Sequence, residues 1–235
     1  MTDAVFQRDS YLQELEAVVT MIDGEYVELD QTIFYAEGGG QPGDSGVMLN
    51  SGGQAAPVLD TRKTASGVIR HQMSSVDHGL KMGDTARLKI DWGRRYRLMR
   101  MHTSMHLLGS LIPVPVTGGQ VGVDKSRLDF DLGDHQLDKV DLTIRMNALI
   151  ESGLEIELEA ITEAELDEKP ELVRTMSVYP PRGVGVIRMI RIDGVDFQPC
   201  GGTHVKNTSE IGPVKISKIE NKGKRNRRVH LVLES

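Results

Sequence analysis

The fold depends on Met101-His102-Thr103-Ser104-Met105-His106, a segment that contains two histidines four residues apart. Apolar residues recur around it at steps of three and four, namely Leu98, Met101, Met105, Leu108 and Ile112. This spacing predicts a helix that lies on a hydrophobic core, and Pro113 and Pro115 predict its end near residue 111. On such a helix both imidazoles can reach one metal ion, because they lie one turn apart on the same face. Taken alone, such a pair is more often polar surface or a hydrogen-bonded part of the core.

A second pair of potential metal ligands has the same spacing. The only cysteine, Cys200, is followed four residues later by His204 in Cys200-Gly201-Gly202-Thr203-His204. Together the two pairs supply one sulfur and three nitrogens, a complete tetrahedral set for zinc. The alternative is a buried structural cysteine with an unrelated histidine nearby. We favour a shared zinc site at His102, His106, Cys200 and His204, because both pairs share one spacing and the cysteine has no disulfide partner.

The two motifs resemble the editing domain of alanyl-tRNA synthetase. More closely, the chain resembles the free-standing alanyl-tRNA editing proteins of the AlaX type, medium-length class. Residues 34–46, Phe-Tyr-Ala-Glu-Gly-Gly-Gly-Gln-Pro-Gly-Asp-Ser-Gly, are similar to the glycine-rich motif of that class. Residues 124–131 and 219–224 are also similar to family segments. The resemblance runs from about residue 5 to the end of the chain.

The resemblance implies an aminoacyl-tRNA deacylase, a carboxylic ester hydrolase that removes serine, and also glycine, from mischarged alanine tRNA. It implies Zn²⁺ as cofactor and tRNA as partner. With 235 residues there is no room for the other domains of a synthetase, so the protein is expected to act in trans. The segment after the helix falls where the family places pocket residues, which makes Thr117 and Gln120 candidates for contact with a substrate hydroxyl. The catalytic group stays unassigned, because Cys200 is given to zinc and no Ser–His–Asp set presents itself.

Composition limits the class of protein. The chain has 28 Lys plus Arg against 34 Asp plus Glu, which argues against a generally basic nucleic-acid binder. One cysteine fits a reducing cytosol. No apolar run is long enough for a signal peptide or a membrane span, so we expect a cytoplasmic protein without membrane contact. The sequence does not indicate an oligomeric state.

The fold class predicted is α+β, with two domains. Residues 1–92 are expected to form a glycine-rich small β-barrel, because short strands alternate with turn signals such as Asp23-Gly24. Residues 93–235 are expected to form a two-layer editing domain of helices packed on an antiparallel sheet. A polar, glycine-rich loop is expected at 117–122. A helix is expected at 136–152, and its inward residues are Leu137, Val140, Ile144 and Ala148.

Positive charge gathers in the last segment of this acidic chain. The centre of the cluster is a turn-like run whose proposed RNA-binding residues are Lys222, Lys224, Arg225, Arg227 and Arg228. Such a cluster suits contacts with phosphate groups. In the glycine-rich loop, Glu37 and Gln41 are further candidates for tRNA contact. This loop lacks the Lys-Ser/Thr ending of a P-loop, which argues against ATP binding.

Two other functions remain open. The threonyl-tRNA editing domain has a related arrangement of His-x3-His and Cys-x3-His, although the Cys-Gly-Gly-Thr-His motif and the triple glycine favour the alanine system. A non-catalytic RNA-binding module stabilised by zinc is the second alternative. Removal of zinc separates the two classes, because a structural site would unfold without metal whereas an editing site should lose activity first.

Overall fold

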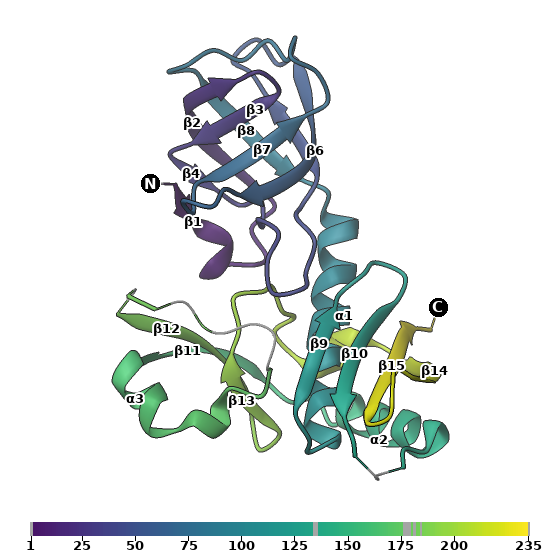
Figure 1. The fold of residues 1–235 in the computed structure, drawn as a ribbon. Helices are drawn as coiled ribbons and strands as arrows, with labels where there is room; N and C mark the ends of the chain where they lie inside the picture. Colours follow the sequence, from purple (N-terminus) through teal and green to yellow (C-terminus); the bar gives the residue numbers. More distant parts are fainter. Residues whose placement is uncertain (1, 134–135, 176–179, 181, 184, 235) are drawn as a thin grey trace. The chain divides into compact units, whose positions relative to one another are not determined.

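The computed structural model describes residues 2–133, 136–175, 180, 182–183 and 185–234. It divides the chain into two compact units, Met1–Arg97 and Leu98–Ser235. The division lies inside helix α1 (Trp92–Leu111), and the boundary expected between residues 92 and 93 falls at the start of that helix. Each unit is rich in antiparallel strands, with helices mainly in the second, so the α+β class is confirmed (Figure 1).

The first unit contains a closed barrel of six strands, as the sequence predicts (Figure 1). In barrel order these are β2 (Glu14–Asp23), β3 (Tyr26–Leu29), β7 (Ile69–Met73), β6 (Ala55–Lys63), β5 (Gly46–Leu49) and β8 (Thr85–Ile90). Two short strands, β1 (Asp3–Ala4) and β4 (Gln31–Thr32), pair in parallel outside the barrel. The predicted hairpin turn is confirmed, because Asp23 pairs with Tyr26 and Gly24 has a φ of 60°. Only glycine adopts that conformation at no steric cost.

The described residues of the second unit form two antiparallel sheets rather than one. The four-stranded sheet has the order β14 (Val214–Asn221), β15 (Asn226–Leu233), β10 (Ser126–Asp131) and β9 (Val116–Gln120). The three-stranded sheet has the order β11 (Ile156–Thr162), β12 (Val186–Ile192) and β13 (Asp196–Pro199). The remaining α-helices are α2 (Lys139–Glu151) and α3 (Glu163–Glu168). Short 3-10 turns occur at Val5–Gln7, Pro170–Leu172 and Thr208–Ile211.

Helix α1 matches the prediction made from its apolar spacing. All five residues of the predicted stripe are buried, namely Leu98, Met101, Met105, Leu108 and Ile112. The helix ends at Leu111. Its polar residues at 102, 103, 104 and 106 are buried as well, so this part of the helix is enclosed on more than one side.

The inward face predicted for helix α2 is wrong. Val140 and Ile144 are each 64% exposed, whereas the buried residues are Leu142, Met146 and Ile150. The helix carries apolar side chains on two faces, and periodicity could not choose between them. The choice follows from the edge strand β14, whose backbone at Val214 exchanges two hydrogen bonds of 2.9 Å with the side chain of Asn147. This pairing turns the other face of α2 to solvent.

Residues 117–120 belong to a strand, which corrects the loop expected at 117–122. A Cβ added to Gly119 would lie 3.1 Å from Leu128 Cδ2 and 3.3 Å from Met105 Cε. The glycine therefore allows β9 to approach β10 and helix α1 closely, where the sequence suggested a turn.

Thr162 and Glu165 form a capping box at the start of the short helix α3. Within the part of the chain that the structure describes, no helix is long and apolar enough to span a membrane.

Candidate functional site

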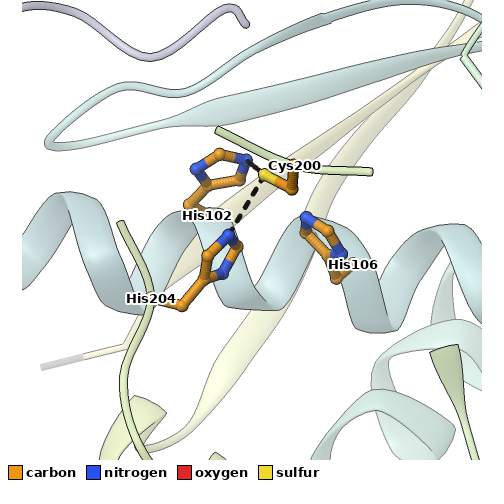
Figure 2. A group of neighbouring side chains, drawn as sticks. All are labelled: His102, His106, Cys200 and His204. Atoms are coloured by element: carbon orange, nitrogen blue, oxygen red, sulfur yellow. Dashed lines mark hydrogen bonds between the residues drawn. The ribbon is translucent and has the colours of Figure 1, made fainter. Parts of the chain in front are cut away.

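The four residues proposed as metal ligands come together in the second unit (Figure 2). Helix α1 presents His102 and His106, while Cys200 directly follows strand β13 and His204 lies four residues further on. One ligand atom from each residue lies within 4.8 Å of the others. The three histidines are buried and the cysteine is partly buried. Two segments that are almost 100 residues apart therefore meet at one point.

The donor set and the spacing of its atoms fit a zinc ion. Sγ of Cys200 lies 3.6 Å from Nε2 of His102 and 3.3 Å from Nε2 of His204. Sulfur and nitrogen ligands of a tetrahedral zinc, with bonds of about 2.3 and 2.0 Å, lie about 3.5 Å apart. Sulfur with imidazole nitrogen is a ligand combination that suits zinc and other borderline-soft ions.

The rings of two histidines are held by residues that the sequence analysis did not identify. Nδ1 of His106 lies 2.7 Å from Oδ2 of Asp196, and Nδ1 of His204 lies 3.1 Å from Oγ1 of Thr103. In each ring this contact occupies Nδ1 and leaves Nε2 available to a metal. Thr103 lies inside the His-x3-His motif and Asp196 lies four residues before Cys200. That closeness in sequence was the only available signal.

The electrostatics of the cluster favour the form of cysteine that binds metals. Burial raises the pKa of the Cys200 thiol, but the adjacent His102 and His204 lower it by more and hold this pKa well below its usual value. Burial and the neighbouring His102 lower the pKa of His204 well below its ordinary range. Burial also lowers the pKa of His106, yet its hydrogen bonds to Asp196 and Cys200 outweigh that effect and raise this pKa to about 10. The thiolate is therefore stabilised within the cluster.

The two pocket candidates lie on strand β9 in different surroundings. Thr117 is half-buried, and its hydroxyl donates to Oδ1 of Asn226 at 3.1 Å. Gln120 is exposed, and its Oε1 accepts from Nε of Arg127 at 3.3 Å. Solvent exposure makes Gln120 the weaker candidate for a pocket that excludes water.

The basic residues are divided between a turn and a strand. Lys222, Lys224 and Arg225 lie in the exposed turn between β14 and β15, whereas Arg227 and Arg228 lie at the start of β15. Several cations are paired with acids at the following N–O distances: Lys222 with Glu220 at 3.2 Å, Arg225 with Asp131 at 3.0 Å and Arg228 with Asp129 at 2.8 Å. Lys224 is exposed and forms no ion pair with any residue in the described ranges.

The glycine-rich loop lies in the first unit. Gln41 is completely buried, so it cannot contact RNA as the sequence analysis suggested. Glu37 is exposed and lies 3.5 Å from Nε of Arg62. Gly43 explains part of the glycine content, because a Cβ there would lie 2.1 Å from the carbonyl oxygen of Thr61.

Two family models match the chain. The model described as "Threonyl and Alanyl tRNA synthetase second additional domain" matches residues 187–230, a range that contains Cys200, His204 and the basic cluster. The model described as "tRNA synthetases class II (A)" matches residues 4–94, which include the barrel.

Individual relatives match over almost the whole chain. An alanyl-tRNA editing protein AlaX-M of Methanosarcina barkeri is 41% identical over 99% of both chains. The AlaX-M protein of Saccharolobus solfataricus is 33% identical over 100% of both chains. An alanine–tRNA ligase of Pyrobaculum arsenaticum is 36% identical over 93% of this chain but only 25% of the ligase. The chain therefore belongs to the AlaX-M family of alanyl-tRNA editing proteins.

Proposed function

We propose that this protein hydrolyses the ester that joins a wrong amino acid to alanine tRNA, with seryl-tRNA as the main substrate and glycyl-tRNA as a second one. The convergence of four ligand atoms within 4.8 Å carries the proposal. Membership of the alanyl-tRNA editing family supports the same substrate class. The match with AlaX-M proteins over 99% of their length, against 25% of the ligase, supports action in trans.

We propose Zn²⁺ as the ion and His102, His106, Cys200 and His204 as its ligands. When bound, zinc would supply a fixed positive charge that attracts and orients polar groups of the aminoacyl ester. Four protein ligands favour a role in positioning and discrimination. In this arrangement Cys200 is a ligand and does not act as the nucleophile.

The reaction itself is the addition of one water molecule across an ester. The water oxygen forms a bond to the acyl carbon, the bond from that carbon to the ribose oxygen breaks, and the ribose oxygen receives a proton. An aminoacyl ester is already labile, so correct placement of the ester and the water supplies much of the acceleration. The proton acceptor is either a polar group of the pocket or the free hydroxyl of the terminal ribose.

Discrimination against alanine follows from the hydroxyl of serine. A pocket built to bind that hydroxyl leaves a polar group without a partner when alanine is present, and such a loss discriminates strongly. Thr117 is the better candidate for this contact, because it is half-buried whereas Gln120 is exposed. Glycine is smaller than alanine and enters by size alone, so we expect it to be the poorer substrate.

We assign this chemistry to the second unit, Leu98–Ser235, because it contains all four ligand candidates. The basic cluster at 222–228 lies in the same unit and is proposed to contact tRNA phosphates. Its cations lie in a turn and in the strand that follows, on the same sheet as Thr117.

Deacylation assays test the proposal. We expect the zinc-loaded protein to hydrolyse seryl-tRNA made on alanine tRNA quickly, glycyl-tRNA more slowly, and alanyl-tRNA hardly at all. Loss of one of four ligands should weaken zinc binding by about 100-fold or more, so Cys200→Ala should hydrolyse the seryl ester far more slowly at limiting zinc. Seryl-tRNA that survives as long with the folded, zinc-loaded protein as in buffer would contradict the enzyme proposal and leave the RNA-binding module.

A further inference from the structure

The ligand candidates come from two segments, helix α1 and residues 196–204. Each segment also contacts a histidine ring of the other. Helix α1 presents His106, whose Nδ1 contacts Asp196 of the C-terminal segment at 2.7 Å. The C-terminal segment presents His204, whose Nδ1 contacts Thr103 of helix α1 at 3.1 Å. These crossed contacts connect the helix to the segment from β13 to His204. They identify two residues that bear on the ligands without being ligand candidates themselves.

The carboxylate of Asp196 is the more tightly held of the two. Its side chain is 1% exposed. Oδ2 accepts from Nε2 of Gln198 at 2.7 Å as well as from the ring of His106, and Oδ1 lies 3.4 Å from Nη1 of Arg174. A carboxylate with donors on both oxygens has little freedom to turn.

This environment determines which nitrogen of His106 carries hydrogen. An ionised carboxylate only accepts hydrogen bonds, so the contact of 2.7 Å with Asp196 places a proton on Nδ1 of His106. Nε2 of Gln198 lies 3.1 Å from the same Nδ1 but closer, at 2.7 Å, to Oδ2 of Asp196, which is its acceptor. In the neutral ring that binds a metal, the lone pair is then on Nε2. Thr103 does not impose a tautomer in this way, because a hydroxyl both donates and accepts.

Strand β13 positions both Asp196, the acceptor for His106, and the ligand candidate Cys200 that follows it. Asp196 and Gln198 are two residues apart on the strand and therefore point to the same side. Asp196 pairs with Ile192 and Gln198 with Ile190 of β12, which fixes their register. Cys200 follows directly, so one piece of backbone places both the thiol and the acceptor for His106.

We propose that Asp196 is a positioning residue: it holds His106 as the Nδ1-protonated tautomer, with Nε2 directed to the ligand cluster, and thereby sets the affinity of the site for its metal. The inference rests on the proposed function only in taking zinc as the metal. Asp196 is not one of the four ligand candidates, so its removal is expected to act through the ring of His106.

The test measures metal affinity directly. Zinc affinity is determined by competition with a chelator for the wild type, Asp196→Ala, Asp196→Asn and the control Asp193→Asn, which changes an exposed aspartate in the same hairpin. We expect Asp196→Ala to bind zinc about 10- to 100-fold more weakly. Asp196→Asn keeps an acceptor but loses the charge, so its loss should be smaller, and the control should stay within about twofold of the wild type. Cobalt(II) bound in place of zinc should show altered visible absorption bands in the Asp196 variants, because one nitrogen ligand is displaced.

Zinc affinity within twofold of the wild type in both folded Asp196 variants overturns the proposal. If Asp196→Ala does not fold, the nearly isosteric Asp196→Asn decides, and an affinity equal to that of the control rejects the positioning role. A wild type that binds zinc but does not hydrolyse seryl-tRNA overturns the proposed function alone, provided that zinc affinity still falls in the Asp196 variants. A wild type that binds no zinc overturns both.

Discussion

Each unit of this protein buries a group of polar side chains, and the two groups differ in the partners they suit. In the first unit, Arg95 and His71 are paired within the chain: Nε of Arg95 donates to Asp44 at 2.9 Å, and His71 lies between the hydroxyl of Thr32 and a backbone carbonyl. In the second unit, three imidazoles and a thiol direct their ligand atoms towards one point. Lone pairs that converge are complementary to a cation rather than to one another.

The difference shows how burial alone can mislead. Arg95 and His71 are both completely buried, yet their partners belong to the chain, so we infer a role in stability. The partly buried Cys200 and its three histidines form a set whose ligand atoms could share one metal ion. The donor and acceptor character of the neighbours, rather than the depth of burial, therefore separates a structural polar group from a functional one.

The largest effect expected from this comparison is on the buried ion pair of the first unit. Arg95 also donates to the carbonyl oxygens of Ser10 at 3.0 Å and Ile33 at 2.7 Å. Arg95→Met leaves the carboxylate of Asp44 buried without its cation, which should lower the free energy of unfolding by about 3–5 kcal/mol. Urea unfolding followed by the fluorescence of Trp92 measures it, because this residue packs against the barrel core.

The same substitution at an exposed ion pair is the control. Arg87 pairs with Glu14 on the barrel surface, and its side chain is 59% exposed. Arg87→Met should change the free energy of unfolding by less than about 1 kcal/mol. Equal losses for Arg87→Met and Arg95→Met would contradict the view that the buried pair is a specific structural contact.

The second effect concerns pH. Burial lowers the pKa of His71 to about 4 from 6.5, although its hydrogen bond to Val27 opposes the shift. Folding therefore favours the neutral ring, and this contribution is fully present above pH 6.5. As the pH falls from 6.5 towards 4, protonation of the unfolded chain should remove about 3 kcal/mol of stability.

Comparison with His71→Gln isolates this contribution from the titration of acids. Urea unfolding at several pH values between 6.5 and 4, again followed by Trp92 fluorescence, should give a steeper loss for the wild type than for the variant. Parallel curves for the two proteins would show that His71 does not titrate in the way its surroundings imply.

The smallest effect is expected for a cation that faces solvent. Lys224 is exposed in the turn between β14 and β15, and we expect its ammonium group to contact a tRNA phosphate. Lys224→Ala should lower tRNA affinity severalfold and reduce the slope of log affinity against log salt by about 0.7–0.9. Binding measured over a range of KCl concentrations, with exposed Lys139→Ala as control, gives both quantities. An unchanged slope for Lys224→Ala would place the RNA contact elsewhere.

Local sequence patterns were sufficient to predict individual helices and turns and the type of ligands in the candidate metal site. The apolar spacing of α1 predicted its buried stripe, Pro113 and Pro115 predicted its end near Leu111, and Asp23-Gly24 predicted the first hairpin of the barrel. The shared spacing of the two ligand pairs predicted which residues meet. Periodicity, turn chemistry and ligand type are all encoded within a few neighbouring residues, so no knowledge of distant contacts was needed.

Tertiary structure decided which faces meet and which groups hold the site. Val140 and Ile144 face solvent because Asn147 binds the edge of β14. Residues 117–120 form a strand because Gly119 fits against Leu128 and Met105. Asp196 and Thr103 contact the ligand rings across 90 and 101 residues of sequence. Such contacts depend on how the elements pack against one another. The local sequence pattern around a residue does not indicate which distant residue it will contact.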